Sequence, residues 1–197
     1  MARPTLEGTR QLGDFATTYN WMLTLDVPSG AIAFADADIA QFYSNTGNGV
    51  DRINLRCTST ELPDKEIDPI SINIRGFKSK QPGQAKYKDS IDLKFIDTVD
   101  GMVEAFFSAW LESSWRTSDG YQMSKLGNQG LCTISRLDRQ SYNESVSKIW
   151  DYILVGAWCS KVSKPTLNSD NGLYEVTATI QMDYFKNLSQ NHPAVVK

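Results

Sequence analysis

The residue types that most often carry catalysis are sparse in this sequence of 197 residues. Its one histidine, His192, lies beside Pro193 in a polar C-terminal stretch. Nucleophilic hydrolases need a histidine on a rigid part of the fold, within hydrogen-bonding reach of a serine or cysteine. A polar terminal stretch does not provide that rigidity. The sequence therefore predicts no catalytic residue of these classes and favours a protein that is not an enzyme.

Two short motifs could hold a metal ion or a phosphate group, but each lacks a necessary residue. Asp36-Ala37-Asp38 opens like a calcium loop, yet its sixth position is Gln41 instead of glycine and its twelfth is Gly47 instead of glutamate. Gly47-Asn48-Gly49 is followed by Arg52, where a dinucleotide-binding loop needs its third glycine. We therefore expect neither a metal ion nor a cofactor.

The cysteines and carboxylates give weak signals. Cys57, Cys132 and Cys159 are far apart and form no Cys-x-x-Cys pair, so we expect buried or half-buried thiols in place of disulfides or a zinc site. Carboxylates such as Asp92 and Asp183 could meet in the folded protein, as in a glycoside hydrolase, although charges that alternate along strands usually form a solvated face. A carbohydrate-acting enzyme stays open as a minor alternative.

Length and charge limit the remaining classes. A chain of this length is most simply one domain. The net charge of −3 and the pI near 5.2 disfavour a protein that neutralises many phosphates. A local basic cluster around Pro82-Gly83 is predicted to be a solvated loop or to contact an acidic neighbour. No apolar run approaches the roughly 20 residues that span a bilayer, so we expect a cytosolic protein without a membrane anchor.

Alternating apolar and polar residues predict a mainly β protein. The clearest pattern is Tyr174–Phe185, where Val176, Ala178 and Ile180 share one face. The polar face of this predicted strand comprises Glu175, Thr177, Thr179, Gln181 and Asp183. Ile149–Trp158 has bulky apolar residues on both faces, as in a strand that is covered on both sides. Further strands are predicted at residues 21–27, 53–57, 70–74, 91–95 and 131–137.

One helix is predicted, at Gly101–Arg116. Apolar residues recur there at three- and four-residue spacing, and Asp97, Thr98 or Asp100 can cap its first turn. The residues of this face are Met102, Val103, Phe106, Phe107, Trp110, Leu111 and Trp115. The stripe could form a cofactor or partner groove, but a helix that packs its aromatic face into a β-sandwich or barrel is the preferred interpretation.

The domain organisation follows from these elements. We predict an N-terminal arm at residues 1–19, one β domain at 20–185 with an insertion at 28–50, and a loose tail at 186–197. Leu62–Asp68 and Phe77–Lys88 are predicted to be long loops on either side of a strand, too long for tight hairpin turns, that order against neighbouring subunits. The predicted assembly residues are Leu62, Pro63, Asp64, Ile67, Phe77, Lys78, Lys80, Lys86 and Lys88.

Several motifs occur in a recognisable order. Asn20-Trp21 opens a strand, Cys57-Thr58-Ser59-Thr60-Glu61-Leu62-Pro63 closes another, and the strand at Ile91–Asp97 leads into the aromatic helix. Val155-Gly156-Ala157-Trp158 and Ile180-Gln181-Met182-Asp183-Tyr184-Phe185 follow. In this order, across residues 14–186, the chain resembles the tail-tube proteins of contractile-tailed bacteriophages.

The resemblance implies a small β-barrel or sandwich with a flanking helix. It also implies hexameric rings whose joined sheets line a tube for DNA ejection, with the polar face at Glu175–Asp183 as the possible lumen wall and DNA in weak transit. The implied partners are tail sheath, baseplate and tail-terminator proteins, and the implied location is the virion tail, after synthesis in the cytoplasm of a bacterial host. Related tubes occur in type VI secretion and in phage-derived bacteriocins.

Two kinds of alternative remain open from the sequence. A tube-initiation protein, a baseplate-junction protein or a secretion-tube subunit would share this architecture without growing long tubes alone. A small-ligand-binding β-barrel belongs to another class, as does the carbohydrate-acting enzyme. Assembly state discriminates between the two kinds, because only the first forms rings.

Overall fold

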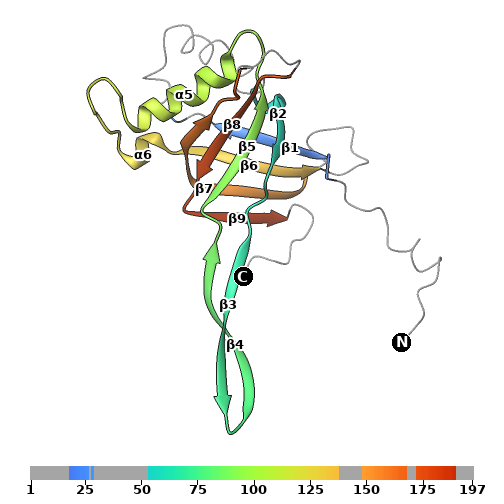
Figure 1. Cartoon of the computed structure of the whole chain (residues 1–197). Coiled ribbons are helices and arrows are strands. Elements are labelled where there is room, and N and C mark those ends of the chain that lie inside the picture. Colours follow the sequence, from blue (N-terminus) through green and yellow to red (C-terminus); the bar gives the residue numbers. More distant parts are fainter. Residues whose placement is uncertain (1–17, 27, 29–52, 138–147, 168–171, 190–197) are drawn as a thin grey trace, which may run out of the picture.

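The structure is a computed structural model that describes residues 18–26, 28, 53–137, 148–167 and 172–189. Within these residues, two antiparallel sheets share one long strand, β7 (Lys148–Ser163). The first half of β7 pairs with β6 (Gly130–Leu137) and β9 (Tyr184–Ser189), and β6 also pairs with β1 (Trp21–Asp26). These four strands are called the first sheet here and run across the view in Figure 1.

The second half of β7 begins the second sheet. It pairs with β8 (Glu175–Gln181), which is followed by β5 (Ser90–Ile96) and then by β2 (Cys57–Thr60). These strands run up the view in Figure 1, across the direction of the first sheet. Among the described strands, β1 and β2 end the hydrogen-bonded order and do not pair with each other. The expected β fold is confirmed, as an open sandwich and not as a closed barrel.

Gly156 lies where β7 passes from one sheet to the other. Its φ is +71°, and a Cβ at this position would clash with the carboxylate of Asp183. Only glycine combines that backbone conformation with so close an approach. The backbone N–H of Asp183 donates to the carbonyl of Val155 at 2.9 Å and fixes the turn between β8 and β9 beside the bend.

This turn corrects the prediction of a single strand at Tyr174–Phe185. β8 ends at Gln181, and the chain turns before β9 begins at Tyr184. The apolar alternation continues through the turn because Met182 still points into the core, with 5% of its surface exposed. β9 runs to Ser189, so residues 186–189 belong to the first sheet and not to a loose tail.

The predicted helix is confirmed as α5 (Met102–Ser114), which packs against β7 and β8. Its Phe106, Phe107 and Trp110 are fully buried and form a cluster of aromatic rings with Phe95 of β5. The indole N–H of Trp110 donates to the carbonyl of Asn128 at 3.0 Å, at the end of the short helix α6 (Lys125–Asn128). The prediction is wrong at the C-terminal end, because Leu111 is half-buried and Trp115 is 58% exposed.

Asp97 caps α5, as one of the three predicted candidates. Its carboxylate is nearly buried and accepts from the backbone N–H of Thr98 at 2.9 Å, of Val103 at 3.2 Å and of Glu104 at 3.0 Å. Asp100 also accepts from the N–H of Met102, at 3.5 Å. Carboxylates at this end of a helix satisfy free N–H groups and oppose the positive end of its dipole.

The strand predicted at residues 53–57 is wrong. Residues 53–55 form a helical turn, and β2 begins only at Cys57. Ile53 is nevertheless fully buried while Leu55 is 85% exposed. Apolar residues at every second position suggested a strand here. In the structure, one of them is a core residue and the next is a surface residue of a helical turn.

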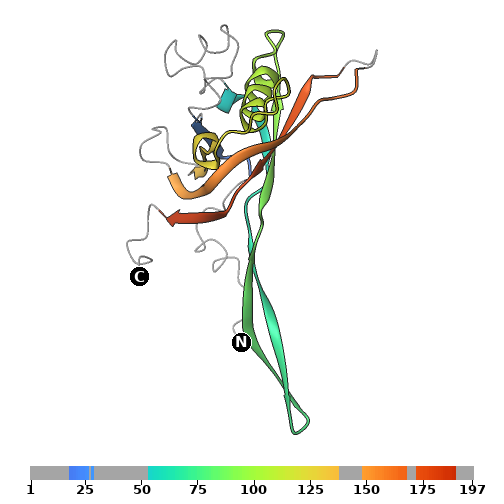
Figure 2. The same cartoon turned by 90° about the vertical axis from the view of Figure 1, so that its left-hand side faces the viewer.

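The largest correction concerns the two predicted loops. Residues 65–74 and 77–87 form β3 (Lys65–Ile74) and β4 (Phe77–Tyr87), an antiparallel hairpin that projects from the sandwich (Figures 1 and 2). The turn consists of Arg75 and Gly76, with φ of 48° and 86°. Positive φ at both central residues is typical of the type I′ turn that matches the twist of a tight hairpin. Pro82, part of the predicted loop, faces Pro69 across the hairpin at a register shift.

Several predictions lie outside the described residues. They concern the arm at residues 1–17, nearly all of the insertion at 28–50 and the tail beyond Ser189. The same holds for the calcium-like motif at Asp36, the glycine motif at Gly47 and His192.

Candidate assembly surfaces

The hairpin exposes apolar side chains that no described part of its own subunit covers. β3 and β4 pack on each other and hardly at all on the remaining described chain. In the register of the hairpin, Ile74 opposes Phe77, and Ile70 and Ile72 follow on the same face of β3. Phe77 is 82% exposed and Ile74 is 62% exposed. Large apolar side chains on a projecting element mark a surface for contact with another protein.

The hairpin is also the basic part of the molecule. Residues 65–87 contain five basic and two acidic residues, a net charge of +3, whereas the whole chain carries −3. Lys78 and Lys80 oppose Asn73 and Ser71 on the face that is not apolar. At its base, Lys86 pairs with Asp68 at 2.6 Å and Lys88 pairs with Glu61. The free positive charge therefore lies in the outer half, around Arg75, Lys78 and Lys80.

The structure distributes the predicted assembly residues over the hairpin and its base. Ile67, Phe77, Lys78, Lys80 and Lys86 lie on the hairpin itself, and Leu62, Asp64 and Lys88 lie at its base. Pro63 is buried, so it is not available for contact. The exposed Ile70, Ile74 and Arg75 were not among the predicted assembly residues, because the alternation of the isoleucines suggested a strand facing its own core.

A second surface is the outer face of the second sheet. In Figure 2, α5, α6 and the first sheet lie on one side of this sheet, and no described element covers the other side. Glu175, Thr177, Thr179 and Gln181 alternate with the buried residues of β8 and share this face. Asp92 and Lys94 of β5 lie opposite Thr179 and Thr177. Thr179 donates its hydroxyl to Asp92 at 2.7 Å.

Asp183 was also predicted to lie on this polar face, but the structure places it elsewhere. It lies past the end of β8, where both of its carboxylate oxygens accept from the Nζ of Lys125, at 2.6 and 2.7 Å. The strand ends before the alternation reaches it. The corner between β8 and β9 is therefore a separate surface.

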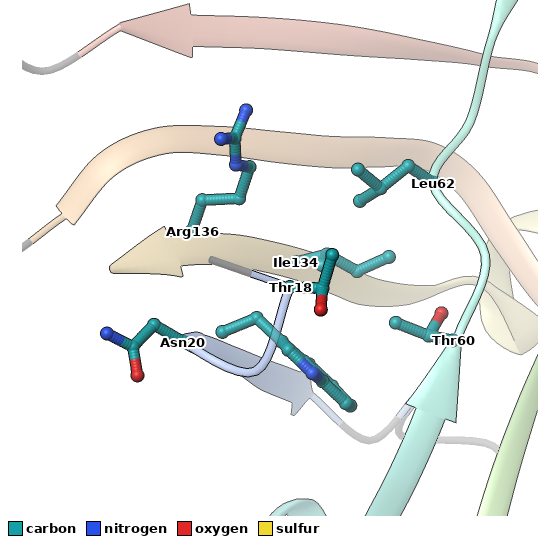
Figure 3. Close-up of a pocket in the computed structure, with 7 residues that line it drawn as sticks. Thr18, Asn20, Thr60, Leu62, Ile134 and Arg136 are labelled. Atoms are coloured by element: carbon teal, nitrogen blue, oxygen red, sulfur yellow. The ribbon is translucent and has the colours of Figure 1, made fainter. Parts of the chain in front are cut away.

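A third surface is a pocket of about 280 Å³ beside β2 (Figure 3). Trp21 of β1 and Ile134 of β6 contribute apolar walls, and Leu62 lies opposite them on the segment that leaves β2. Arg136 of β6 also lines it, with Thr18, Asn20 and Thr60 as the polar neighbours. No sequence pattern indicates this pocket, because its walls come from three distant segments.

The titratable groups of the described chain do not form a reactive centre. Burial raises the pKa of Cys57 to about 12 and that of Cys159 to about 12, and it also raises the pKa of Cys132. These thiols therefore stay protonated and poorly nucleophilic. Among residues 53–137 and the other described ranges, no three metal-ligating side chains come together. None of the helices in those ranges is long and apolar enough to cross a membrane.

Ion pairs instead fix α5 to the second sheet. Glu104 pairs with Lys164 at 2.5 Å and accepts a hydrogen bond from the hydroxyl of Tyr174 at 2.7 Å. These contacts, that of Lys164 first, lower the pKa of Glu104. Arg56 contacts Asp100 at 3.1 Å, and this bond, with that of Thr98, lowers the pKa of Asp100 to about 2. The charged groups around α5 therefore stabilise the fold.

In the part of the chain that the structure describes, the polar face of the second sheet and the amphipathic hairpin are both uncovered, so both are available for contacts with another chain. The family comparison identifies the assembly. The chain belongs to the phage tail tube protein family, whose model matches residues 16–188. It is a family of structural tube proteins and not of enzymes, so the chain is a structural tube subunit.

Solved structures share the fold. A chain of the sheath/tube terminator of the extracellular contractile injection system PVC, in its extended state, matches with a TM-score of 0.57 and 15% identity over 90% of this chain and 99% of that one. A chain of the PVC sheath–tube complex matches with a TM-score of 0.55 and 14% identity over 94% and 99%. A chain of the tube-terminating cap of the anti-feeding prophage gives 0.54 and 14% over 90% and 93%. A comparison with curated protein sequences finds no match.

Proposed function

We propose that this protein is the repeating subunit of a phage tail tube, forming hexameric rings that stack into a conduit for DNA. The unpacked hairpin is the observation that supports this most directly. A two-stranded hairpin is marginally stable in water unless it packs on something else. An element that exposes Phe77 and Ile74 is stabilised when a neighbouring copy covers it.

The outer face of the second sheet is proposed to line the lumen. Its exposed side chains are polar and carry charges of both signs, Asp92 and Glu175 against Lys94 and Lys161. A conduit for DNA works best when its wall does not hold phosphates, because each neutralised phosphate releases counterions and strengthens binding. We expect no sub-micromolar binding of duplex DNA at physiological salt, as measured by fluorescence anisotropy. Tighter binding would contradict the conduit and favour the basic hairpin as a nucleic-acid site.

Stacking is proposed to join the hairpin of one ring to the opposite end of the next. Figures 1 and 2 both show the hairpin at one end of the molecule and the connection between β5 and α5 at the other. Val99 in that connection is fully exposed. The apolar face of the hairpin tip complements this exposed apolar residue.

The remaining partners follow from the same role. Tail sheath, baseplate and tail-terminator proteins are the proposed neighbours, and the mature virion tail is the proposed location, after synthesis in the cytoplasm of the bacterial host. A second candidate is a subunit at the end of a tube, because the chains that share its fold include those of terminator and cap complexes. A subunit of a secretion tube is expected to form the same kind of ring. Such proteins form rings but do not grow long tubes alone.

Electron microscopy of the purified full chain tests the proposal. Long tubes of uniform diameter are the result expected of the main tube subunit, and isolated rings are the result expected of an end subunit. Sedimentation velocity across a range of protein concentrations gives the assembly state in solution. A chain that stays monomeric at every concentration and salt condition would contradict both candidates.

A further inference from the structure

The pocket beside β2 lies at one end of the strands of the first sheet. The register opposes Trp21 of β1 to Arg136 of β6, and Arg136 in turn to Trp150 of β7. Trp150 opposes Ser189, the last residue of β9. The pocket therefore opens beside the row where β1 begins and β6 ends, at the side of the sandwich that Figure 3 shows in close-up.

Arg136 gives this pocket its chemical character. The guanidinium carries a positive charge and five N–H donors. It forms no ion pair with any described residue. Thr18, Asn20 and Thr60 are the other polar residues that line the pocket, and Trp21 and Leu62 contribute an apolar wall. Such a pocket fits a carboxylate that is joined to an aromatic or apolar group.

The other end of the same strands carries a carboxylate beside an aromatic side chain. There the register opposes Asp26 to Leu131, and Val155 to Tyr184. Asp183 directly precedes Tyr184, whose surface is 40% exposed. The carbonyl of Asp89 accepts from the N–H of Met182, so a second carboxylate residue lies at the same corner. Lys125 is the cation that the structure pairs with this corner.

The two surfaces cannot meet within one chain. Trp21 and Asp26 are five residues apart along β1, which corresponds to about 17 Å of extended strand. A second copy placed side by side brings the corner of one chain to the pocket of the next. A contact between two different patches on identical subunits repeats around an axis and closes into a ring when the rotation allows it. The hairpin projects across this direction in Figure 1, so the same contact does not compete with stacking.

We propose that the Arg136 pocket binds the Asp183–Tyr184 corner of the neighbouring copy in the same ring. In this contact Arg136 donates to the carboxylate of Asp183, and the ring of Tyr184 lies against Trp21 and Leu62. The proposal rests on the proposed ring assembly and identifies the surface that closes the ring. It also explains why Arg136 has no acidic partner among the described residues of its own chain.

Cross-linking tests the contact directly. Asn20→Cys lies in the pocket and Lys186→Cys lies on β9 two residues from Tyr184, so a chain that carries both keeps Arg136, Asp183 and Tyr184 intact. A short bis-maleimide cannot join these positions within one chain, because β6 and β7 lie between β1 and β9. We expect a ladder of covalent oligomers up to the size of the ring. Chains with either cysteine alone, or with Glu112→Cys and Lys186→Cys together, should give no ladder.

Charge reversal gives a second, independent measurement. Arg136→Glu should raise the protein concentration at which rings form by about tenfold or more, since it replaces attraction by repulsion at the contact. Adding Asp183→Lys together with Lys125→Asp, which keeps an ion pair between positions 125 and 183 within the subunit, should recover most of this loss. Lys94→Glu makes the same change of charge on the exposed face of β5 and should leave ring formation unchanged. Circular dichroism and thermal melting establish that each variant is folded.

The outcomes separate this inference from the proposed function. If the parent chain forms rings, while the double-cysteine chain gives no ladder and Arg136→Glu assembles normally, the inference is wrong and the ring subunit stands. If the parent forms no rings under any condition, the proposed function fails and this contact fails with it. A ladder together with recovery by Asp183→Lys and Lys125→Asp supports both.

Discussion

The sandwich and the hairpin have the same alternation of apolar and polar residues, but the apolar residues are buried in the sandwich and exposed in the hairpin. In the sandwich, Ile91, Leu93 and Phe95 of β5 alternate with polar residues and are at most 1% exposed. In the hairpin, Ile70 and Ile74 of β3 alternate in the same way and are more than half exposed. The first set meets α5 and the other sheet, whereas the second set meets solvent in the isolated subunit. The comparison shows that one part of the chain stabilises the subunit and another is available to join subunits.

This division between the two regions leads to an expectation for the free energy of unfolding. Substitutions in the sandwich should change the free energy of unfolding of the subunit, and substitutions in the hairpin should change assembly alone. The four predictions below are ordered by their expected effect on the unfolding free energy, from the largest to the smallest.

The largest effect is expected from Trp110→Asp. Trp110 is fully buried and donates to the carbonyl of Asn128, so the variant loses its packing and places an unpaired charge in the core. We expect a loss of at least about 4 kcal/mol in the free energy of unfolding, or failure to fold. Denaturant unfolding followed by circular dichroism measures it. Trp115→Asp, at the residue that directly follows the same helix and is 58% exposed, is the matched control and should cost less than about 1 kcal/mol.

The next effect is expected from Asp97→Ala. Removal of this carboxylate leaves the backbone N–H groups of Val103 and Glu104 in the first turn of α5, and that of Thr98 before the helix, without their acceptor. We expect a loss of about 1–3 kcal/mol, in the range of a lost helix cap and unsatisfied buried donors. Asp100→Ala removes a more exposed carboxylate and should cost less. Equal losses for the two variants would show that burial of the cap does not matter.

The sequence predicts the sandwich well where its contacts are local. The apolar spacing of α5 and the acidic residues before it lie within one stretch of sequence, and the strand at Tyr174–Gln181 shows its period directly. The hairpin could not be predicted in this way. Alternation indicates that two faces differ, but it does not tell whether the apolar face meets its own core or another chain. Pro69, Pro82 and Gly83 added a loop-like composition to two strands.

The pocket is even harder than the hairpin to predict from local sequence patterns. Arg136 is one of several basic residues in the sequence, and its isolation from carboxylates depends on which strands lie beside β6. The corner at Asp183 depends in the same way on the bend at Gly156, which no spacing of residues indicates. Surfaces formed by long-range pairing of strands require the register, and the register is a property of the whole sheet.

A smaller effect is expected from acid at Asp100. Its folded-state pKa of about 2 lies below its usual value of 3.8, so the unfolded state binds a proton first as the pH falls. The contribution of this carboxylate is therefore present above about pH 4 and is lost as the pH falls toward 2. Asp100→Asn should flatten this part of the stability profile. Denaturant midpoints at pH 5 and pH 2.5 measure it, and parallel profiles for parent and variant would contradict the role of the Arg56 pair.

The smallest effect on the subunit is expected from Phe77→Asp, and it tests the comparison most sharply. Phe77 is 82% exposed beside the turn of the hairpin, so the substitution should change the free energy of unfolding by no more than about 0.5 kcal/mol. In the assembled tube the same side chain is expected to be covered, where a carboxylate would lose water without gaining a partner. We therefore expect rings without stacked tubes in electron microscopy.

The matched control is Ser71→Asp, which adds the same charge to the opposite face of the hairpin. It should leave tubes of normal length, although it lies beside Lys80 and lowers the positive charge of that face. If Phe77→Asp forms tubes as long as those of the parent, the apolar face of the hairpin does not join rings, and stacking must depend on its basic face. If instead Phe77→Asp unfolds the subunit, the hairpin belongs to the stable core and the division between the two regions is wrong.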